Sequence, residues 1–179
     1  MRSLIFVLSL GFSLLANAQL GDRFPELTGE TLESLQISIP SDTDDKITLV
    51  GLAYSKKAEE TLKTWYTPIY DKFVLKRGIF DEFYDVNLFF VPMFSGAKKA
   101  TYESTLKKLK QSNRKDLFPY ILFYKGSMKP YVDNLEMDNK ALPYFFVLDE
   151  AGTILYATKG LYSERKMEAI EEILDSRME

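Results

Sequence analysis

The chain has 179 residues, of which 46% are apolar and 27% charged, and its formal net charge is −3. These values predict one folded domain with a sizeable core and give no global attraction to nucleic acid. The sequence contains no cysteine and no histidine. This excludes disulfides, thiolate nucleophiles, iron–sulfur clusters, Ser-His-Asp triads and histidine-ligated metals. The sequence has no cofactor-binding motif either, so any chemistry must come from carboxylate, lysine, tyrosine and hydroxyl groups.

The first eighteen residues predict a secretory signal peptide. A positive charge at Arg2 precedes an apolar stretch at 4–15 that is too short to span a bilayer, and an Ala-Asn-Ala sequence at 16–18 has the small-x-small pattern of a cleavage site. An uncleaved anchor or a buried first helix is the alternative interpretation. With cleavage, the folded chain comprises residues 19–179. It then lies outside the cytoplasm, periplasmic or secreted, in a compartment that permits disulfides it does not use.

The first elements after the leader follow from apolar spacing. A turn-rich opening at 21–27 and a polar loop at 41–45 precede a continuous apolar run at 47–53, which predicts a strand buried on both faces. Apolar residues then recur at helical spacing over 57–74. Because Pro68 lies inside that pattern, we expect a kink or a break in the turn before it.

The middle of the chain predicts shorter elements. Residues 77–85 indicate a short helix and a turn, and residues 86–91 a second strand that Pro92 stops. Residues 98–111 predict a basic helix whose inner side carries one tyrosine and two leucines. Residues 118–124 predict another strand, which a proline near its start places at a sheet edge.

The C-terminal part predicts a hairpin and a helix. Strands at 144–148 and 153–157 flank a turn at 149–152, and Ser163 caps a final helix. The order strand, helix, strand, helix, hairpin, helix requires parallel strands joined by a right-handed crossover and then extended antiparallel. We therefore expect an α/β sandwich of three layers, with a mixed central sheet in which a βαβ unit is followed by a β-hairpin and a C-terminal helix.

This order of elements resembles the thioredoxin-like superfamily. The opening at 21–27 is similar to the lead-in of its secreted members, Leu142-Pro143 stands at the position of its cis-proline, and residues 149–154 resemble its hairpin turn. The resemblance implies a thioredoxin-like fold with a cis Leu142–Pro143 bond beside the segment where the redox motif belongs. That segment reads Tyr-Ser-Lys-Lys-Ala at 54–58, and both sulfurs are missing.

A closer resemblance is to the cysteine-free members that assist assembly of the mitochondrial ATP synthase membrane sector. That family has a Trp-x-x-Pro segment after the first strand, which residues 65–68 match. Its C-terminal signature is matched by Asn139, Leu142, Tyr144, Val147, Leu148, Asp149, Gly152 and Ile154. The sequence departs from the family at 155–157, where a basic-aromatic segment is replaced, and in its secretory leader. The resemblance implies a redox-inactive assembly factor.

Three sets of residues invite a chemical interpretation. Alternating acids at 42–45 resemble the start of a calcium loop, but the required glycine is missing, which favours a solvated loop. Asp133, Glu136 and Asp138 offer oxygen ligands, although their spacing matches no metal motif and again favours a solvated loop. Residues 55–56 resemble a Ser–Lys dyad, which requires a desolvated lysine that an exposed loop does not provide.

The segment that replaces the redox motif is also a candidate binding site. A helix N-terminus carries free N–H groups and a partial positive charge, and the two lysines here add to that field. Tyrosines nearby offer contact area with a polar tip. The predicted contact residues are Tyr54, Ser55, Lys56, Lys57, Pro143 and Tyr144. They are expected to line a cleft between residues 54–58 and Pro143; two solvated lysines are the alternative.

A second candidate surface is strongly basic. Between residues 97 and 115 the chain has a single glutamate against seven basic residues: Lys98, Lys99, Lys107, Lys108, Lys110, Arg114 and Lys115. Such a segment is either a solvated helix face or a peripheral contact with an anionic membrane or an acidic protein.

Two classes of function remain open. In the first, the domain is not an enzyme and takes no cofactor; it binds a protein or peptide partner and helps assembly or folding without redox chemistry. In the second, it is a non-redox enzyme that uses carboxylate, lysine or hydroxyl groups, with or without a divalent metal. We favour the first class.

Overall fold

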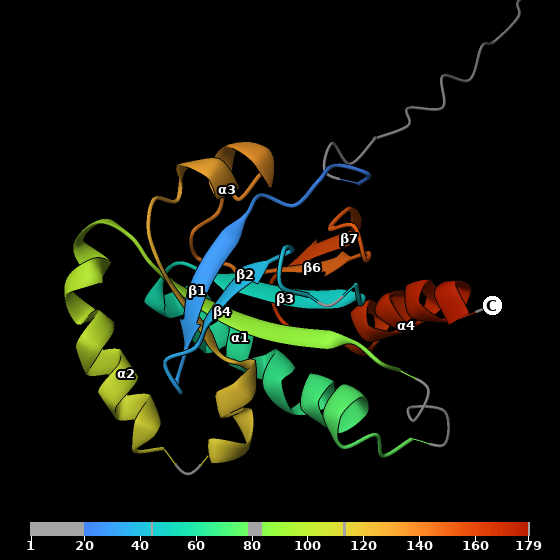
Figure 1. The fold of residues 1–179 in the computed structure, drawn as a ribbon, viewed down its shortest axis with the longest axis horizontal. Helices are drawn as coiled ribbons and strands as arrows, with labels where there is room; N and C mark the ends of the chain where they lie inside the picture. The colour runs from blue at the N-terminus through green and yellow to red at the C-terminus, as the bar shows by residue number, and fades with distance from the viewer. Residues whose placement is uncertain (1–19, 44, 79–83, 113, 179) are drawn as a thin grey trace, which may run out of the picture.

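The computed structural model describes residues 20–43, 45–78, 84–112 and 114–178. Its centre is a seven-stranded mixed sheet with the strand order β2-β1-β5-β4-β3-β6-β7 (Figure 1). The predicted leader at 1–18, with the boundary that it sets for the domain, lies outside the described residues. So does most of the helix and turn predicted at 77–85.

The sheet is organised around β3 (Thr48–Ala53), whose six residues are all buried. It pairs in parallel with β4 (Asn87–Phe94) and antiparallel with β6 (Tyr144–Leu148), which in turn pairs antiparallel with β7 (Ile154–Lys159). The predicted central strands and hairpin are therefore confirmed. At Gly51 a Cβ atom would lie 2.9 Å from a leucine side chain of the helix above, so the glycine lets that helix approach the sheet closely.

Helices cover both faces of the sheet and make the three layers that the sequence predicts. One face packs against α1 (Lys56–Ile69) and α4 (Glu164–Met178), and the other against α3 (Lys129–Asn134) and the loop after it. Neighbouring β3 residues alternate between the two clusters: Leu49 faces α1, and Val50 faces α3. The predicted inner residues of α4 are buried or half-buried: Met167, Ile170, Ile173 and Leu174.

The sequence patterns do not predict the N-terminal hairpin. β1 (Leu27–Thr31) and β2 (Gln36–Ile39) pair antiparallel, and β1 also pairs with β5 (Leu122–Lys125). β5 therefore lies inside the sheet, between β1 and β4, and the prediction of an edge strand is wrong. The proline that suggested an edge, Pro119, belongs to a preceding 3-10 helix (Lys115–Tyr120), so it takes no part in the strand ladder.

Two other prolines do not end the elements that contain them. β4 runs through Pro92, which lies opposite Ala53 at the end of the β3–β4 ladder, where a missing N–H removes little pairing. α1 likewise continues through Pro68. The departure from α-helical geometry comes after the proline, as a π-helical turn at Tyr70–Val74. The predicted strand end at residue 92 and helix break before residue 68 are both wrong.

The predicted basic helix is shorter than expected. A 3-10 helix (Gly96–Thr101) precedes α2 (Tyr102–Lys110). Tyr102 is buried, and Leu106 and Leu109 are half-buried against the end of the sheet. The inner face of α2 is therefore the predicted one.

The chain enters the fold by docking on the β6–β7 hairpin. The Gly21 N–H donates to Ile154 O at 2.9 Å, and the Phe24 N–H donates to Gly152 O at 2.8 Å. The Phe24 side chain is only 1% exposed and meets the Phe146 ring edge-on, with centroids 5.6 Å apart. The first described residues are thereby fixed beside the last strands of the chain.

Candidate functional site

The segment that stands in place of a redox motif joins β3 to α1. Ser55 is the N-cap of α1: its backbone is extended, with φ −141° and ψ 160°, and its Oγ accepts the Ala58 N–H at 3.1 Å. Serine is among the residues that best satisfy the free N–H groups of a helix start. Residues 54–57 consequently lie just beyond β3, where its parallel ladder with β4 ends.

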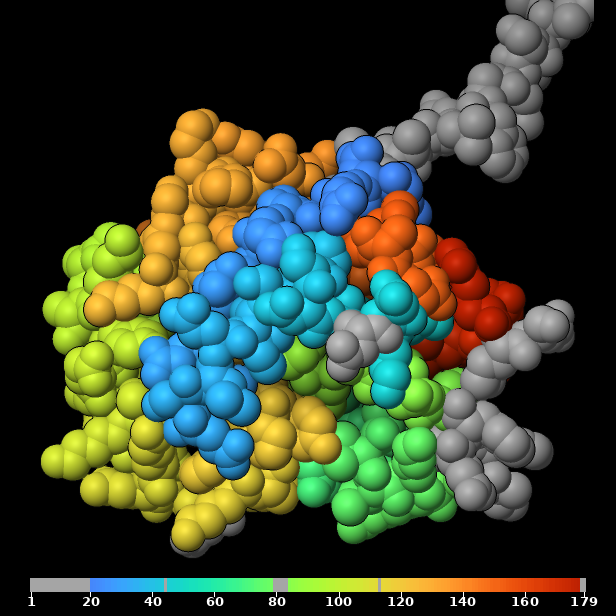
Figure 2. Space-filling view, in the orientation of Figure 1, coloured from blue at the N-terminus to red at the C-terminus, as the bar shows by residue number. Residues whose placement is uncertain are grey.

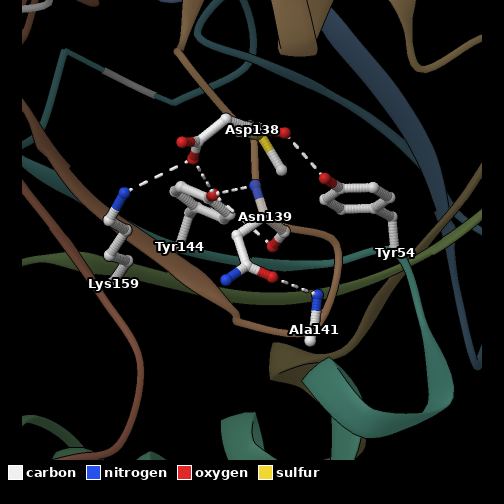
Figure 3. Close-up of polar contacts among 7 residues, drawn as sticks. Tyr54, Asp138, Asn139, Ala141, Tyr144 and Lys159 are labelled. Atoms are coloured by element: carbon white, nitrogen blue, oxygen red, sulfur yellow. Dashed lines mark hydrogen bonds and ion pairs between the residues drawn. The ribbon is translucent and has the colours of Figure 1, made fainter.

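A short segment from the other side of the sheet covers this position. Residues 137–141, here called the strap, lie between α3 and β6 (Figure 3). The Tyr54 hydroxyl donates to Met137 O at 2.6 Å, and the Ser55 hydroxyl donates to Lys140 O at 2.5 Å. The strap is therefore fastened by the side chains on which a binding cleft was predicted.

The bond between Leu142 and Pro143 is trans. The cis X-Pro bond within the described ranges is Ile39–Pro40, so the predicted cis bond at Pro143 is wrong. The strap reaches β6 through a turn instead, in which the Leu142 N–H donates to Asn139 O at 3.1 Å and the Ala141 N–H to Asn139 Oδ1 at 3.0 Å. Residues 54–57 and the segment before β6 do lie side by side as predicted. The turn at Asn139–Leu142, rather than a cis-proline, brings them together.

Tyr144 and Asp138 hold the strap from the β6 side (Figure 3). The Tyr144 hydroxyl donates to Asp138 Oδ1 at 2.9 Å and accepts the Asn139 N–H at 2.8 Å, and Lys159 Nζ lies 3.3 Å from the same carboxylate oxygen. The hydrogen bonds from Tyr144 and Lys159 hold the pKa of Asp138 below its usual value. Burial raises the pKa of Tyr144 to about 12, so its hydroxyl keeps its proton near neutral pH.

The six predicted contact residues therefore divide into two groups. Tyr54, Ser55, Pro143 and Tyr144 make internal contacts, and Tyr144 is only 4% exposed. Lys56 and Lys57 are exposed and have no ion-pair partner among the described residues. Lys140 of the strap is also exposed and has no ion-pair partner among the described residues. No sequence pattern singled it out. The predicted cleft is bridged, and what faces solvent is a surface of three lysines, here called the lysine surface.

The described residues of this region are not arranged as a Ser–Lys dyad or as a metal site. A Ser–Lys dyad needs a desolvated lysine, but Lys56 is exposed and the Ser55 hydroxyl donates to a carbonyl. Within the described ranges, no three acidic residues are arranged to hold a metal ion. Of the acids that suggested ligands, Asp42 accepts the Ser38 N–H at 2.8 Å, and Asp133 pairs with Lys129 at 2.5 Å. A polar pocket of about 520 Å³ lies elsewhere, lined by Asp22, Arg23, Pro25, Asp133, Asn134 and Glu136.

The Trp-x-x-Pro segment has a packing role. Trp65 is 1% exposed, and its ring stacks on Phe145 with centroids 4.6 Å apart. Its Nε1–H donates to Gly160 O at 3.0 Å, while the Gly160 N–H donates to Pro143 O at 2.9 Å. Trp65 thus joins α1, β6 and the turn that follows β7. These contacts fix α1, whose first turn carries two of the three lysines, against β6.

Solved structures of other proteins show the same fold. A domain of a putative thiol-disulfide oxidoreductase from Bacteroides thetaiotaomicron is 15% identical, with a TM-score of 0.55 over 89% of this chain and 98% of that one. StoA from Bacillus subtilis is 18% identical, with a TM-score of 0.53 over 84% and 97%. BsSco, of the Sco family of cytochrome c oxidase assembly proteins, is 13% identical, with a TM-score of 0.61 over 87% and 93%. The fold is thioredoxin-like, and the sequence that adopts it contains no cysteine.

The family follows from the sequence itself. The family model described as ATP10 protein matches residues 17–175, so the chain belongs to the ATP10 family. This confirms the resemblance to a family of assembly factors. No curated protein matches the chain.

Proposed function

We propose that this protein is a redox-inactive thioredoxin-like domain that binds a protein or peptide partner and assists its assembly or folding, without enzymatic activity. Two observations support the proposal. The position of the redox motif has a serine cap and two lysines in place of sulfur, and the chain belongs to the ATP10 family. The leader predicted from residues 1–18 supports a location outside the cytoplasm, periplasmic or secreted.

The lysine surface is the observation that carries the proposal. Lys56 and Lys57 occupy the first turn of α1, where a cation is unfavourable to the helix by a few tenths of a kcal/mol because the helix dipole is positive there. The carboxylate of the same turn, Glu59, does not neutralise them, since it pairs with Lys98. Lys140 adds a third unpaired ammonium group. These charges lower the stability of the helix and have no partner within the described residues. They therefore suit an external partner, an acidic segment of a protein.

The backbone beneath these lysines is held by side-chain hydrogen bonds, which favours binding. Ser55 joins the cap of α1 to the strap, and Tyr54 joins the strap a second time. A surface that is already ordered loses little conformational entropy when a partner binds. The positive field speeds the encounter with an acidic partner, and it weakens as salt rises.

The double variant Lys56→Glu/Lys57→Glu tests the function. Because both side chains are exposed, the melting temperature should stay nearly unchanged, within about 0.5 kcal/mol of unfolding free energy. Crosslinking in intact cells followed by mass spectrometry should recover partners with the wild type and lose them with the variant. Lys107→Glu/Lys108→Glu, which changes the net charge equally on another surface, should retain them. An unchanged partner set with Lys56→Glu/Lys57→Glu would show that the lysine surface is merely solvated.

A further inference from the structure

The basic segment between residues 97 and 115 carries less free charge than its sequence suggests. Lys98 turns inward, where its Nζ pairs with Glu59, donates to Met93 O at 2.8 Å and lies 4.6 Å from the centre of the Phe94 ring. Arg114 pairs with Asp116 at 2.9 Å. The remaining basic residues are exposed and have no ion pair among the described residues: Lys99, Lys107, Lys108, Lys110 and Lys115.

These lysines are not needed to hold α2 in place. The helix is attached through its inner face: the Tyr102 ring packs edge-on against Phe94, with centroids 5.2 Å apart, and its hydroxyl donates to Glu30 at 3.2 Å. Leu106 and Leu109 complete that inner face. Since the apolar side of α2 is already covered, its outer side presents ammonium groups without an apolar stripe.

We propose that the outer side of α2, with Lys99 and Lys115 beside it, is a peripheral docking surface for an anionic membrane. α2 forms an outer edge of the molecule, and in Figure 2 its surface lies on the outline on the left (Figures 1 and 2). These unpaired ammonium groups without an apolar stripe are complementary in charge to a layer of anionic headgroups, and each can reach a headgroup on its long flexible stem. Each lysine near an anionic surface adds a roughly equal increment of affinity.

The net negative charge of the chain does not oppose this contact. Five acidic residues lie on α4, at the opposite edge of the molecule in Figure 1, whereas α2 itself carries one, Glu103: the α4 residues are Glu164, Glu168, Glu171, Glu172 and Asp175. Screening at physiological ionic strength acts over about 8 Å, so charges on the far edge have little influence at the α2 surface. No helix in the described part of the chain has the length and apolar character needed to cross a bilayer. The proposed contact is therefore electrostatic and reversible.

Vesicle sedimentation tests this surface. The protein without residues 1–18, which retains every described element, is mixed with vesicles of phosphatidylcholine alone or with phosphatidylglycerol added. We expect sedimentation only with the anionic vesicles and its loss as salt rises. Lys107→Glu/Lys108→Glu should weaken binding at least about tenfold. Lys56→Glu/Lys57→Glu, with the same change in net charge, should bind vesicles like the wild type.

The outcomes separate this proposal from the proposed function. Failure of the wild type to sediment with anionic vesicles at low salt overturns the membrane contact. Equal weakening by the two double variants also overturns it, because the effect would then follow net charge alone. Crosslinks from α2 to an acidic protein without vesicle binding would assign the surface to a protein instead. None of these results changes the expectation that Lys56→Glu/Lys57→Glu loses the partner protein.

Discussion

A single carboxylate, Asp138, joins three parts of the candidate site. It accepts the Tyr144 hydroxyl from β6, lies within ion-pair distance of Lys159 at the end of β7, and belongs to the strap that covers Ser55. The sequence offered Asp138 and neighbouring acids as oxygen ligands but favoured a solvated loop. In the structure it is a hydrogen-bond acceptor whose partners are all internal, so it fixes the position of the strap.

The depressed pKa of Asp138 predicts a pH dependence of stability. Because its pKa is lower in the folded than in the unfolded state, ionised Asp138 stabilises the fold above the unfolded value near 3.9, and this contribution is lost as the pH falls through the folded pKa. Asp138→Asn should therefore lower the melting temperature at neutral pH, and the difference from wild type should close below about pH 4. Thermal unfolding across this range measures it. A difference that is the same at pH 3 and pH 7 would contradict the assignment.

The sequence predicted which residues gather at this site, but not the atoms to which their side chains bind. Tyr54, Ser55 and Tyr144 were placed near one another by the expected topology. Their hydroxyls, however, are directed to carbonyls and a carboxylate of the strap, a segment with no apolar periodicity to mark it. Lys140 was missed for the same reason, since a lone lysine in a polar loop carries no sequence signal.

At the scale of the element, the start of α1 depends on one side chain with two roles. Ser55 Oγ accepts the Ala58 N–H, which caps the helix, and its hydroxyl donates to Lys140 O in the strap. The same serine therefore links helix formation to closure of the site.

Substitution of Ser55 can separate these roles. Ser55→Ala loses both bonds and should lower the free energy of unfolding by about 1–2 kcal/mol. Ser55→Asp keeps an acceptor for the cap but cannot donate to the strap, so it should recover only the part of the loss that comes from the cap. Urea unfolding of the two variants measures the difference. Equal destabilisation by both would show that the strap bond, rather than the cap, carries the effect.

The predictable elements are the ones with long apolar patterns. β3, β6, β7 and α4 were all correctly assigned because continuous or periodic apolar residues mark them. The short strands β1 and β2 were missed, since half-exposed segments of five and four residues look like turns. β5 was placed at an edge because of Pro119, which belongs to the preceding 3-10 helix and not to the strand. Pro68 and Pro92 also led to wrong element boundaries, because the surrounding pairing decides whether a missing N–H weakens an element.

At the scale of the whole molecule, the fold is that of redox proteins but the chain has no sulfur for the reaction. Thiol–disulfide exchange needs a thiolate as nucleophile, and the sequence has no cysteine to supply one. We expect no reduction of insulin and no peroxide turnover by the pure protein, in assays where a thioredoxin control is active. Measurable turnover by the protein would contradict a redox-inactive role.

The docking of Gly21 and Phe24 on the β6–β7 hairpin sets the order in which the fold can close. The first described residues bond to Gly152 and Ile154, about 130 residues later in the sequence. β1 likewise needs β5, far along the sequence. Pairings of such high sequence separation form slowly. The sheet can therefore be completed only after the β6–β7 hairpin has been synthesised.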